Sequence, residues 1–310
     1  MKRVCLLLVI IFCFFLAACG AGRKKTQKPE HLVAGTKEIQ KGIAWYQKGC
    51  YKRALGYFLR AHESFVLSDQ LHGVAMSLNN IGNVYRHMDK IANAILFFEE
   101  SFDIYWDLKN TASAVQVLSN KAAALIAGNQ LQNASAVLSL AKEIAQKNAI
   151  NDKPLLHNQA ILLIKQKEFK QAEEILRQAL DTTDPTNLSA LATVNFACGN
   201  LNLAREKYAE AVKYFKITLA ADRSRGFYKG MADTLAALGT ASVGLGQSAP
   251  AADYYKRSIQ IYALIENKKK VRQTMDAFEK AAKTANLDTR VTKYFVGKWS
   301  KGQVFQGPCQ

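Results

Sequence analysis

The histidines of this 310-residue chain are scattered, and none of them stands in a pattern that supports catalysis. The sequence contains no HExxH motif, no paired cysteines at metal-binding spacing, no glycine-rich phosphate loop and no GxSxG elbow. Acidic residues such as Glu99 and Glu100, or Glu173 and Glu174, fit the solvated face of a helix. We therefore expect no catalytic residue, no metal and no cofactor. An enzyme would need distant titratable groups to meet in one cleft.

The amino terminus has the pattern of a secretion signal. Lys2 and Arg3 precede an apolar run from Val4 to Leu16, which is shorter than the roughly 20 residues that a membrane-spanning helix needs. The sequence LAACG at residues 16–20 resembles a bacterial lipobox. This resemblance implies a signal peptide of residues 1–18, cleavage before Cys19 and attachment of diacylglycerol to the Cys19 sulfur. An uncleaved anchor helix is the alternative.

Acylation of Cys19 would anchor the chain to a membrane of the bacterial cell envelope. A single acyl chain binds a membrane only weakly, whereas several chains on one cysteine bind it stably. The sorting rule of such lipoproteins implies the outer membrane, facing the periplasm, in a Gram-negative cell, because Gly20 is not the aspartate that retains them at the inner membrane. Residues 19–34 are then expected to form a basic, flexible tether without apolar periodicity. The tether is either a solvated spacer or a further contact with anionic lipid head groups.

Positive charge is concentrated at the two ends of the mature chain. Residues 20–41 contain six basic and two acidic residues, and residues 266–310 contain ten basic and four acidic residues, whereas the stretch between them is nearly balanced. The sequence lacks a basic-aromatic motif typical of nucleic-acid binding, so nucleic acid is not expected as a partner. Anionic lipids, acidic envelope polymers or an acidic partner suit an exported chain better.

Residues Ser77 to Tyr105 predict two amphipathic helices that pack on each other. One face of the first helix carries Leu78, Ile81, Gly82 and Tyr85, and one face of the second carries Ala94, Phe98 and Phe102. The small residues Gly82 and Ala94 would let the two helix backbones approach, and the larger side chains would fill the surrounding space. This order of large, small and aromatic residues resembles a tetratricopeptide repeat.

The pattern recurs along the chain. Similar units begin at Gly35, Ala75, Val115, Lys153, Ala192 and Ala232, with steps of 38 to 40 residues. In the fifth unit, either Gly199 or Cys198 fits the small position. The resemblance implies an all-α fold, a right-handed superhelical solenoid of about six tetratricopeptide helix hairpins over residues 35–267, elongated and not divided into compact domains. Because the period near 40 exceeds the usual 34, we expect second helices longer by about one and a half turns.

The carboxyl-terminal part follows the last unit. Residues 268–286 predict one more amphipathic helix, which would cap the exposed apolar face of the solenoid. Residues 287–310 form a basic-aromatic tail that contains Tyr294, Phe295 and Trp299. Either these aromatic side chains fold back on the last helices, or the tail is a free arm for a partner or a membrane surface.

Three cysteines remain after removal of the signal and acylation of Cys19. They are Cys50, Cys198 and Cys309, and an odd number at wide spacings does not indicate a disulfide framework. We expect Cys50, at the turn of the first hairpin, and Cys198, on a core face, to be packing or surface positions. Cys309 could form a disulfide with another chain.

The tetratricopeptide resemblance also names candidate binding residues. In such arrays the first helices line a concave surface, and transfer of the family's contact positions gives Tyr46, Asn79, Asn83, Arg86, His157 and Asn200. Asparagine amides could hold the backbone of an extended peptide, and Arg86 could bind a carboxylate. The family's clamp lysines are absent at matching places, which argues against recognition of a terminal carboxylate. Alternatively, these side chains only bond to neighbouring helices.

Together these expectations describe a membrane-anchored adaptor or scaffold, not an enzyme, that binds a segment of another cell-envelope protein. Resemblance to other tetratricopeptide lipoproteins implies a role like that of a pilotin or an assembly factor for an envelope complex. The alternative is a binder of anionic envelope polymer or glycan through the basic ends. Polymer binding should weaken steeply as ionic strength rises, whereas a groove of apolar and amide contacts should weaken little.

Overall fold

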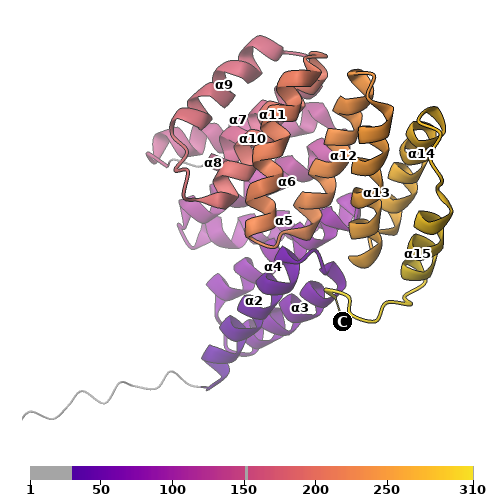
Figure 1. Cartoon of the computed structure of the whole chain (residues 1–310). Helices are drawn as coiled ribbons and strands as arrows, with labels where there is room; N and C mark the ends of the chain where they lie inside the picture. The colour runs from indigo at the N-terminus through magenta and orange to yellow at the C-terminus, as the bar shows by residue number, and fades with distance from the viewer. Residues whose placement is uncertain (1–29, 151–152, 310) are drawn as a thin grey trace, which may run out of the picture.

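The computed structural model describes residues 30–150 and 153–309, and the regular elements in this part of the chain are all α-helices. Consecutive helices pack as antiparallel pairs that stack side by side (Figure 1). The first helices of six pairs are α2 (Glu30–Gln47), α4 (Leu71–His87), α6 (Thr111–Ala127), α8 (Lys153–Lys165), α10 (Leu188–Ala204) and α12 (Tyr228–Gly244). Their partners are α3 (Tyr51–Leu67), α5 (Ile91–Asp107), α7 (Leu131–Lys147), α9 (Phe169–Asp181), α11 (Tyr208–Ser224) and α13 (Ser248–Leu264). The expected all-α solenoid is confirmed.

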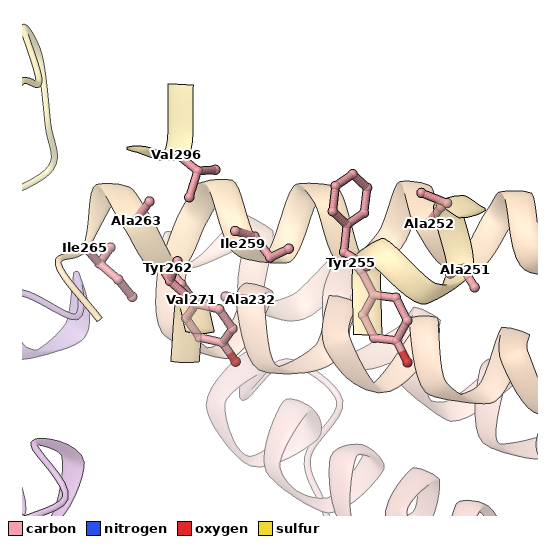
Figure 2. Close-up of a cluster of buried hydrophobic side chains, with 13 residues drawn as sticks. Ala232, Ala251, Ala252, Tyr255, Ile259, Tyr262, Ala263, Ile265, Val271 and Val296 are labelled. Carbon is pink, nitrogen blue, oxygen red and sulfur yellow. The ribbon is translucent and has the colours of Figure 1, made fainter. Parts of the chain in front are cut away.

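Two further helices complete the carboxyl-terminal end. The capping helix is α14 (Lys268–Thr284), which packs on α13 and begins 40 residues after α12, in the place of a further first helix. The tail folds back, because α15 (Arg290–Ser300) packs against α13 and buries Val296. Figure 2 shows Val296 facing the row of apolar side chains on α13.

The second helix is not longer than the first in any of the six pairs, which corrects one expectation from the sequence. Helices α4 and α5 contain 17 residues each, whereas α8 and α9 contain 13 each. Each helix of the second pair is therefore four residues longer than its counterpart in the fourth pair. The extra length is shared by both helices of the pair and is not confined to the second helix. Four of the six first helices begin four residues before the expected unit starts, as α4 begins at Leu71 and α12 at Tyr228. The exceptions are α2, which begins five residues early, and α8, which begins at the expected Lys153.

The first described helix begins earlier than the sequence suggested. Residues 30–34, which were expected to belong to the tether, form the start of α2. The signal peptide of residues 1–18, Cys19 and the rest of the tether lie outside the described residues.

Turns of three residues join most of the helices. In the turn from α3 to α4, Asp69 has a φ of 50°, and the Gln70 N–H donates to the Phe65 carbonyl over 2.9 Å. This arrangement satisfies a carbonyl at the helix end and reverses the chain. Positive φ values recur at the middle residue of later turns, including Asp89 and Lys109. Such short connections leave consecutive helices no choice but antiparallel packing.

Small residues on the first helices allow aromatic rings of the second helices to approach. A Cβ atom added at Gly82 would lie 2.7 Å from Cε1 of Phe98, which is closer than carbon atoms can pack. Gly199 faces Phe215 in the same way, with 2.4 Å to Cε1. Gly199 is therefore the small residue of the fifth pair. Cys198 is buried in the core next to it, as expected.

The two ends of the solenoid meet. Cys50, at the turn between α2 and α3, forms a disulfide with Cys309, and the Lys52 ammonium lies 2.9 Å from Glu266 Oε2. Figure 1 shows the carboxyl terminus beside α3. The sequence expectation was wrong on both cysteines, because Cys50 is bonded and Cys309 pairs within its own chain. The solenoid is closed on itself and not simply elongated.

Candidate binding site on the inner surface

Two neighbouring pockets open on the inner surface of the closed solenoid. The seam pocket has a volume of about 800 Å³ and is lined by residues 50–53, 86–89, 127, 229, 265–270, 273 and 309. The inner pocket has a volume of about 260 Å³ and is lined by residues 87, 157, 192–193, 196, 218, 222, 225, 227, 229–230 and 233–234. His87 and Lys229 line both pockets, so the two spaces adjoin at these side chains.

Arg86, one of the residues expected on the concave surface, lines the seam pocket near the end of α4. Its Nη2 donates to Asn83 Oδ1 over 3.3 Å and to His87 Nε2 over 3.0 Å. Because a guanidinium can only donate, this His87 nitrogen is unprotonated. The Nε atom of Arg86 is buried and has no hydrogen-bond partner among the described residues.

His157, expected on the same surface, lines the inner pocket. Its Nδ1 atom is buried and has no hydrogen-bond partner among the described residues. Burial, with a smaller contribution from the positive charge of Arg86, lowers the pKa of His157 to about 4. His87 of α4 and His157 of α8 line the same pocket, so the second and fourth helix pairs face each other across it.

An aromatic cluster stands beside Arg86. Tyr51 stacks on His87 with ring centroids 5.0 Å apart, and Tyr46 packs edge-on against both rings. Burial and then the cations Arg86 and Lys229 hold the pKa of His87 well below its usual value. Tyr46, a predicted contact residue, therefore lies close to Arg86 but supports the cluster and does not line either pocket.

The predicted asparagines do not line either pocket. Asn79 accepts a hydrogen bond of 2.9 Å from Asn120, which joins α4 to α6. Asn83 donates to the Asn79 carbonyl over 3.1 Å and accepts from Arg86. The amides of Asn79 and Asn83 are thus engaged in hydrogen bonds within the protein. This agrees with the alternative that these side chains only bond to neighbouring residues and helices. Asn200 is half-buried on α10.

Charged side chains that the sequence did not single out meet in the inner pocket. Lys229 pairs with Asp233, whose Oδ1 accepts a hydrogen bond from Tyr262. Asp222 lies 3.2 Å from Arg225 Nε, and its buried position raises the pKa of the Asp222 carboxyl to about 6. An enzyme would require such a cluster of titratable groups in a cleft. If the chain were an enzyme, the inner pocket would be the place for its active site. Its members are largely paired with one another, which also suits a fixed polar lining.

The seam pocket is strongly basic. Seven of its lining residues are basic, namely Lys52, Arg53, Arg86, Lys229, Lys268, Lys269 and Lys270, and two are acidic. Both acidic residues are already engaged, since Glu266 pairs with Lys52 and Asp89 pairs with Lys269. The remaining cations leave an excess of positive charge that faces the pocket.

The register of the helices explains why these residues were missed. Lys229 lies in the first turn of α12, before Ala232, where the expected unit starts, and Asp233 follows that start directly. The basic run Lys268–Lys270 begins the helix that was expected to cap the solenoid, although these residues line the seam pocket. The positive charge of Lys268–Lys270 can be seen in the sequence, but their position in the pocket depends on closure of the solenoid.

Comparison with known proteins agrees with the architecture. Residues 35–105 match the family described as tetratricopeptide repeat. A Rap protein solved in complex with Competence and Sporulation Factor is 14% identical, with 83% of this chain and 78% of that chain covered and a TM-score of 0.56. The Rap conjugation gene regulator of the plasmid pLS20, solved with the Phr peptide, is 14% identical, with coverage of 89% and 78% and a TM-score of 0.56. A tetratricopeptide repeat protein from Parabacteroides merdae ATCC 43184 is 16% identical, with coverage of 86% and 99% and a TM-score of 0.40.

No protein of curated function matches the sequence. At these identities the likeness to the two Rap structures concerns the fold. With the match over the first two helix pairs and the recurrence of the same packing in later pairs, it shows that the described part of this chain folds as a helical solenoid similar to tetratricopeptide-repeat arrays.

Proposed function

We propose that this chain is an exported, lipid-anchored scaffold that holds a segment of another cell-envelope protein against its inner surface. The observation that carries the proposal is the pair of adjoining pockets, which share His87 and Lys229 as lining residues. Solenoids of this type use their curved surfaces for binding. Both Rap proteins of similar fold were solved with a bound factor or peptide, which favours the same class of ligand here.

Features at both ends of the chain support export. The signal-like residues 1–18 and the lipobox resemblance at Cys19 provide a route to the envelope. The disulfide between Cys50 and Cys309 fits an oxidising compartment, because such bonds are rare in the reducing cytosol. Among residues 30–150 and 153–309, no helix has the length and apolarity to cross a bilayer. Acylated Cys19 would then be the anchor, in an outer membrane facing the periplasm if the cell is Gram-negative.

Within such an envelope, the scaffold would assist assembly of a larger complex, as a pilotin or an assembly factor does. The second candidate is a binder of anionic envelope polymer or glycan. The observation that favours it is the basic carboxyl-terminal segment, because Lys268, Lys269 and Lys270 contribute to the seam pocket. In the part of the chain that the structure describes, no three His, Cys, Asp or Glu side chains are grouped to bind a metal ion.

Site-specific photocrosslinking in intact source cells tests the proposal. Benzoylphenylalanine replaces Thr193, an exposed residue that lines the inner pocket, and in a control it replaces Lys216, which is exposed on the second helix of the same pair. The expected result is a discrete crosslinked protein at position 193 and none at position 216. Equal crosslinking from both positions, or none from position 193, would contradict binding at the inner surface.

A further inference from the structure

We propose that the seam pocket binds an acidic stretch of the partner segment, with carboxylates seated on Arg86 and on the first turn of α14. This inference rests on the proposed function, because it assumes that the inner surface holds a polypeptide. It adds the chemistry of the occupant and the place where the acidic stretch lies. The site consists of the seam-pocket cations that the protein's own carboxylates leave without a partner, Arg53, Arg86, Lys268 and Lys270.

The position of the lysines is the first argument. Lys268, Lys269 and Lys270 occupy the first turn of α14, where the helix dipole already places positive charge. Cations at this end weaken a helix, so the three lysines are poorly placed for the stability of α14. Lys269 is compensated by Asp89, whereas the structure pairs no carboxylate with Lys268 or Lys270 among the described residues. An anion in the pocket would neutralise the positive charge of these two lysines and interact favourably with the amino-terminal end of the helix dipole.

Two buried polar atoms on the pocket wall provide the second argument. Tyr51 is 7% exposed, and its hydroxyl has no hydrogen-bond partner among the described residues. Arg86 Nε is buried and also without a partner there. A buried donor without an acceptor is costly, and a carboxylate can accept from both a hydroxyl and a guanidinium. These two residues belong to α3 and α4, opposite the lysines of α14, so an anion between them would be held from both sides of the seam.

The connection between the pockets favours a polypeptide over a small anion. His87 and Lys229 line both spaces, and the inner pocket beyond them carries the rings of Phe196 and Phe227. An extended chain could place acidic residues in the seam pocket and an apolar side chain against these rings. A small polyanion would use the charge of the seam pocket but would leave the apolar lining without a role.

Fluorescence anisotropy with the mature, disulfide-bonded chain tests this inference. The probes are two fluorescein-labelled peptides, six glutamates followed by leucine and six glutamines followed by leucine. We expect the glutamate peptide to bind at least about tenfold more tightly at low salt, since tenfold corresponds to about 1.4 kcal/mol. This difference should shrink as salt is added. Equal binding of the two peptides would overturn the acidic preference but would leave a peptide-binding function in place, whereas loss of the position-193 crosslink would remove that function itself.

Matched variants locate the binding. The double substitution Lys268→Gln and Lys270→Gln should weaken binding of the glutamate peptide about tenfold. The control Lys280→Gln and Lys283→Gln removes the same charge from the same helix, at exposed positions outside the pocket, and should change binding less than about twofold. Equal losses in the two variants would show a general charge effect and overturn the site. Inorganic tripolyphosphate is added as a competitor, and displacement of the peptide at equal charge concentration would assign the pocket to small anions instead.

Discussion

Cys50 and Cys309 are bonded to each other although they lie 259 positions apart in the sequence, and their Cα atoms lie 5.2 Å apart. The bond fastens the last residues of the chain to the first helix pair. Ion pairs between Lys52 and Glu266 and between Asp89 and Lys269 cross the same seam. Because surface ion pairs contribute little individually, the covalent bond is the main constraint that keeps the solenoid closed.

Removal of this disulfide should destabilise the protein. Since both sulfurs belong to one bond, Cys50→Ser, Cys309→Ser and the double variant should each lower the free energy of unfolding by a similar amount, about 2 to 5 kcal/mol. Thermal unfolding followed by circular dichroism measures the effect. Losses that add up in the double variant would show that the two cysteines act independently.

The bond itself can be mapped in the same samples. Trypsin cleavage of the unreduced protein should leave residues 49–52 linked to residues 302–310, because the cleavage sites fall after Lys48, Lys52 and Lys301. Cys198 serves as the internal control. It is a free, buried cysteine, and burial raises the pKa of its thiol to about 12, so it should react with iodoacetamide only after denaturation.

The close approach at Gly82 predicts opposite effects for two glycine-to-alanine substitutions. Gly82→Ala places a methyl group 2.7 Å from the Phe98 ring, and overpacking of this kind costs about 1 to 3 kcal/mol. Gly56→Ala on α3 is the control, because its nearest neighbour is an arginine nitrogen 3.7 Å away and alanine favours a helix by about 1 kcal/mol. Melting temperatures should fall for Gly82→Ala and rise for Gly56→Ala. A stabilised Gly82→Ala variant would mean that the α4–α5 contact is looser than described.

Asp222 predicts a specific dependence of stability on pH. Its pKa is raised to about 6 in the folded chain from an ordinary 3.8, mainly by burial, so between these values the folded state binds more protons than the unfolded state. The contribution of Asp222 to stability therefore decreases as the pH rises from about 4 to about 6. Asp222→Asn, which cannot ionise, should match the parent near pH 3, where the carboxyl is protonated in both states. At pH 7.5 it should exceed the stability of the parent by about 1 to 3 kcal/mol.

A second aspartate provides the matched control. The pKa of Asp288 is lowered from an ordinary 3.8 to about 2 by its hydrogen bonds with Arg290, so this carboxyl is ionised in both the folded and the unfolded chain from pH 5 to 7.5. The difference between Asp288→Asn and the parent should then be constant over that range, as measured by denaturant unfolding. A parallel rise for both variants would point to net charge instead of the burial of Asp222.

Local packing could be predicted from the sequence because each helix pair in a solenoid mainly contacts its neighbours. The pairing of Gly82 with Phe98 and of a small residue with Phe215 follows from spacing alone, and so does the capping helix. Closure of the solenoid depends instead on the small rotation between successive helix pairs, added over all of them. The spacing of residues in the sequence does not reveal this total rotation, so the bond between Cys50 and Cys309 was not predicted.

The candidate site was predicted in part for the same reason. The family positions identified Arg86 and His157, which both line a pocket, because the inward direction of a first helix repeats from unit to unit. Lys229 lies before the expected start of its unit, and Lys268 joins the pocket only through contact between the ends of the solenoid. The asparagines lie at the expected positions, but Asn79 bonds to Asn120 of the next pair, a partner that the sequence could not specify.

The proposed lipid anchor at Cys19 predicts a change in location that is independent of the fold. Cys19→Ala should prevent acylation and move the protein from the membrane fraction to the soluble fraction, because no helix in the described part of the chain is able to span a bilayer. Labelling with radioactive palmitate and fractionation of the cells measure both effects. Cys50→Ser is the control, since it removes a cysteine of the seam and should leave labelling and location unchanged. A Cys19→Ala protein that stays at the membrane with residues 1–18 still attached would contradict the lipid anchor and favour an uncleaved anchor helix.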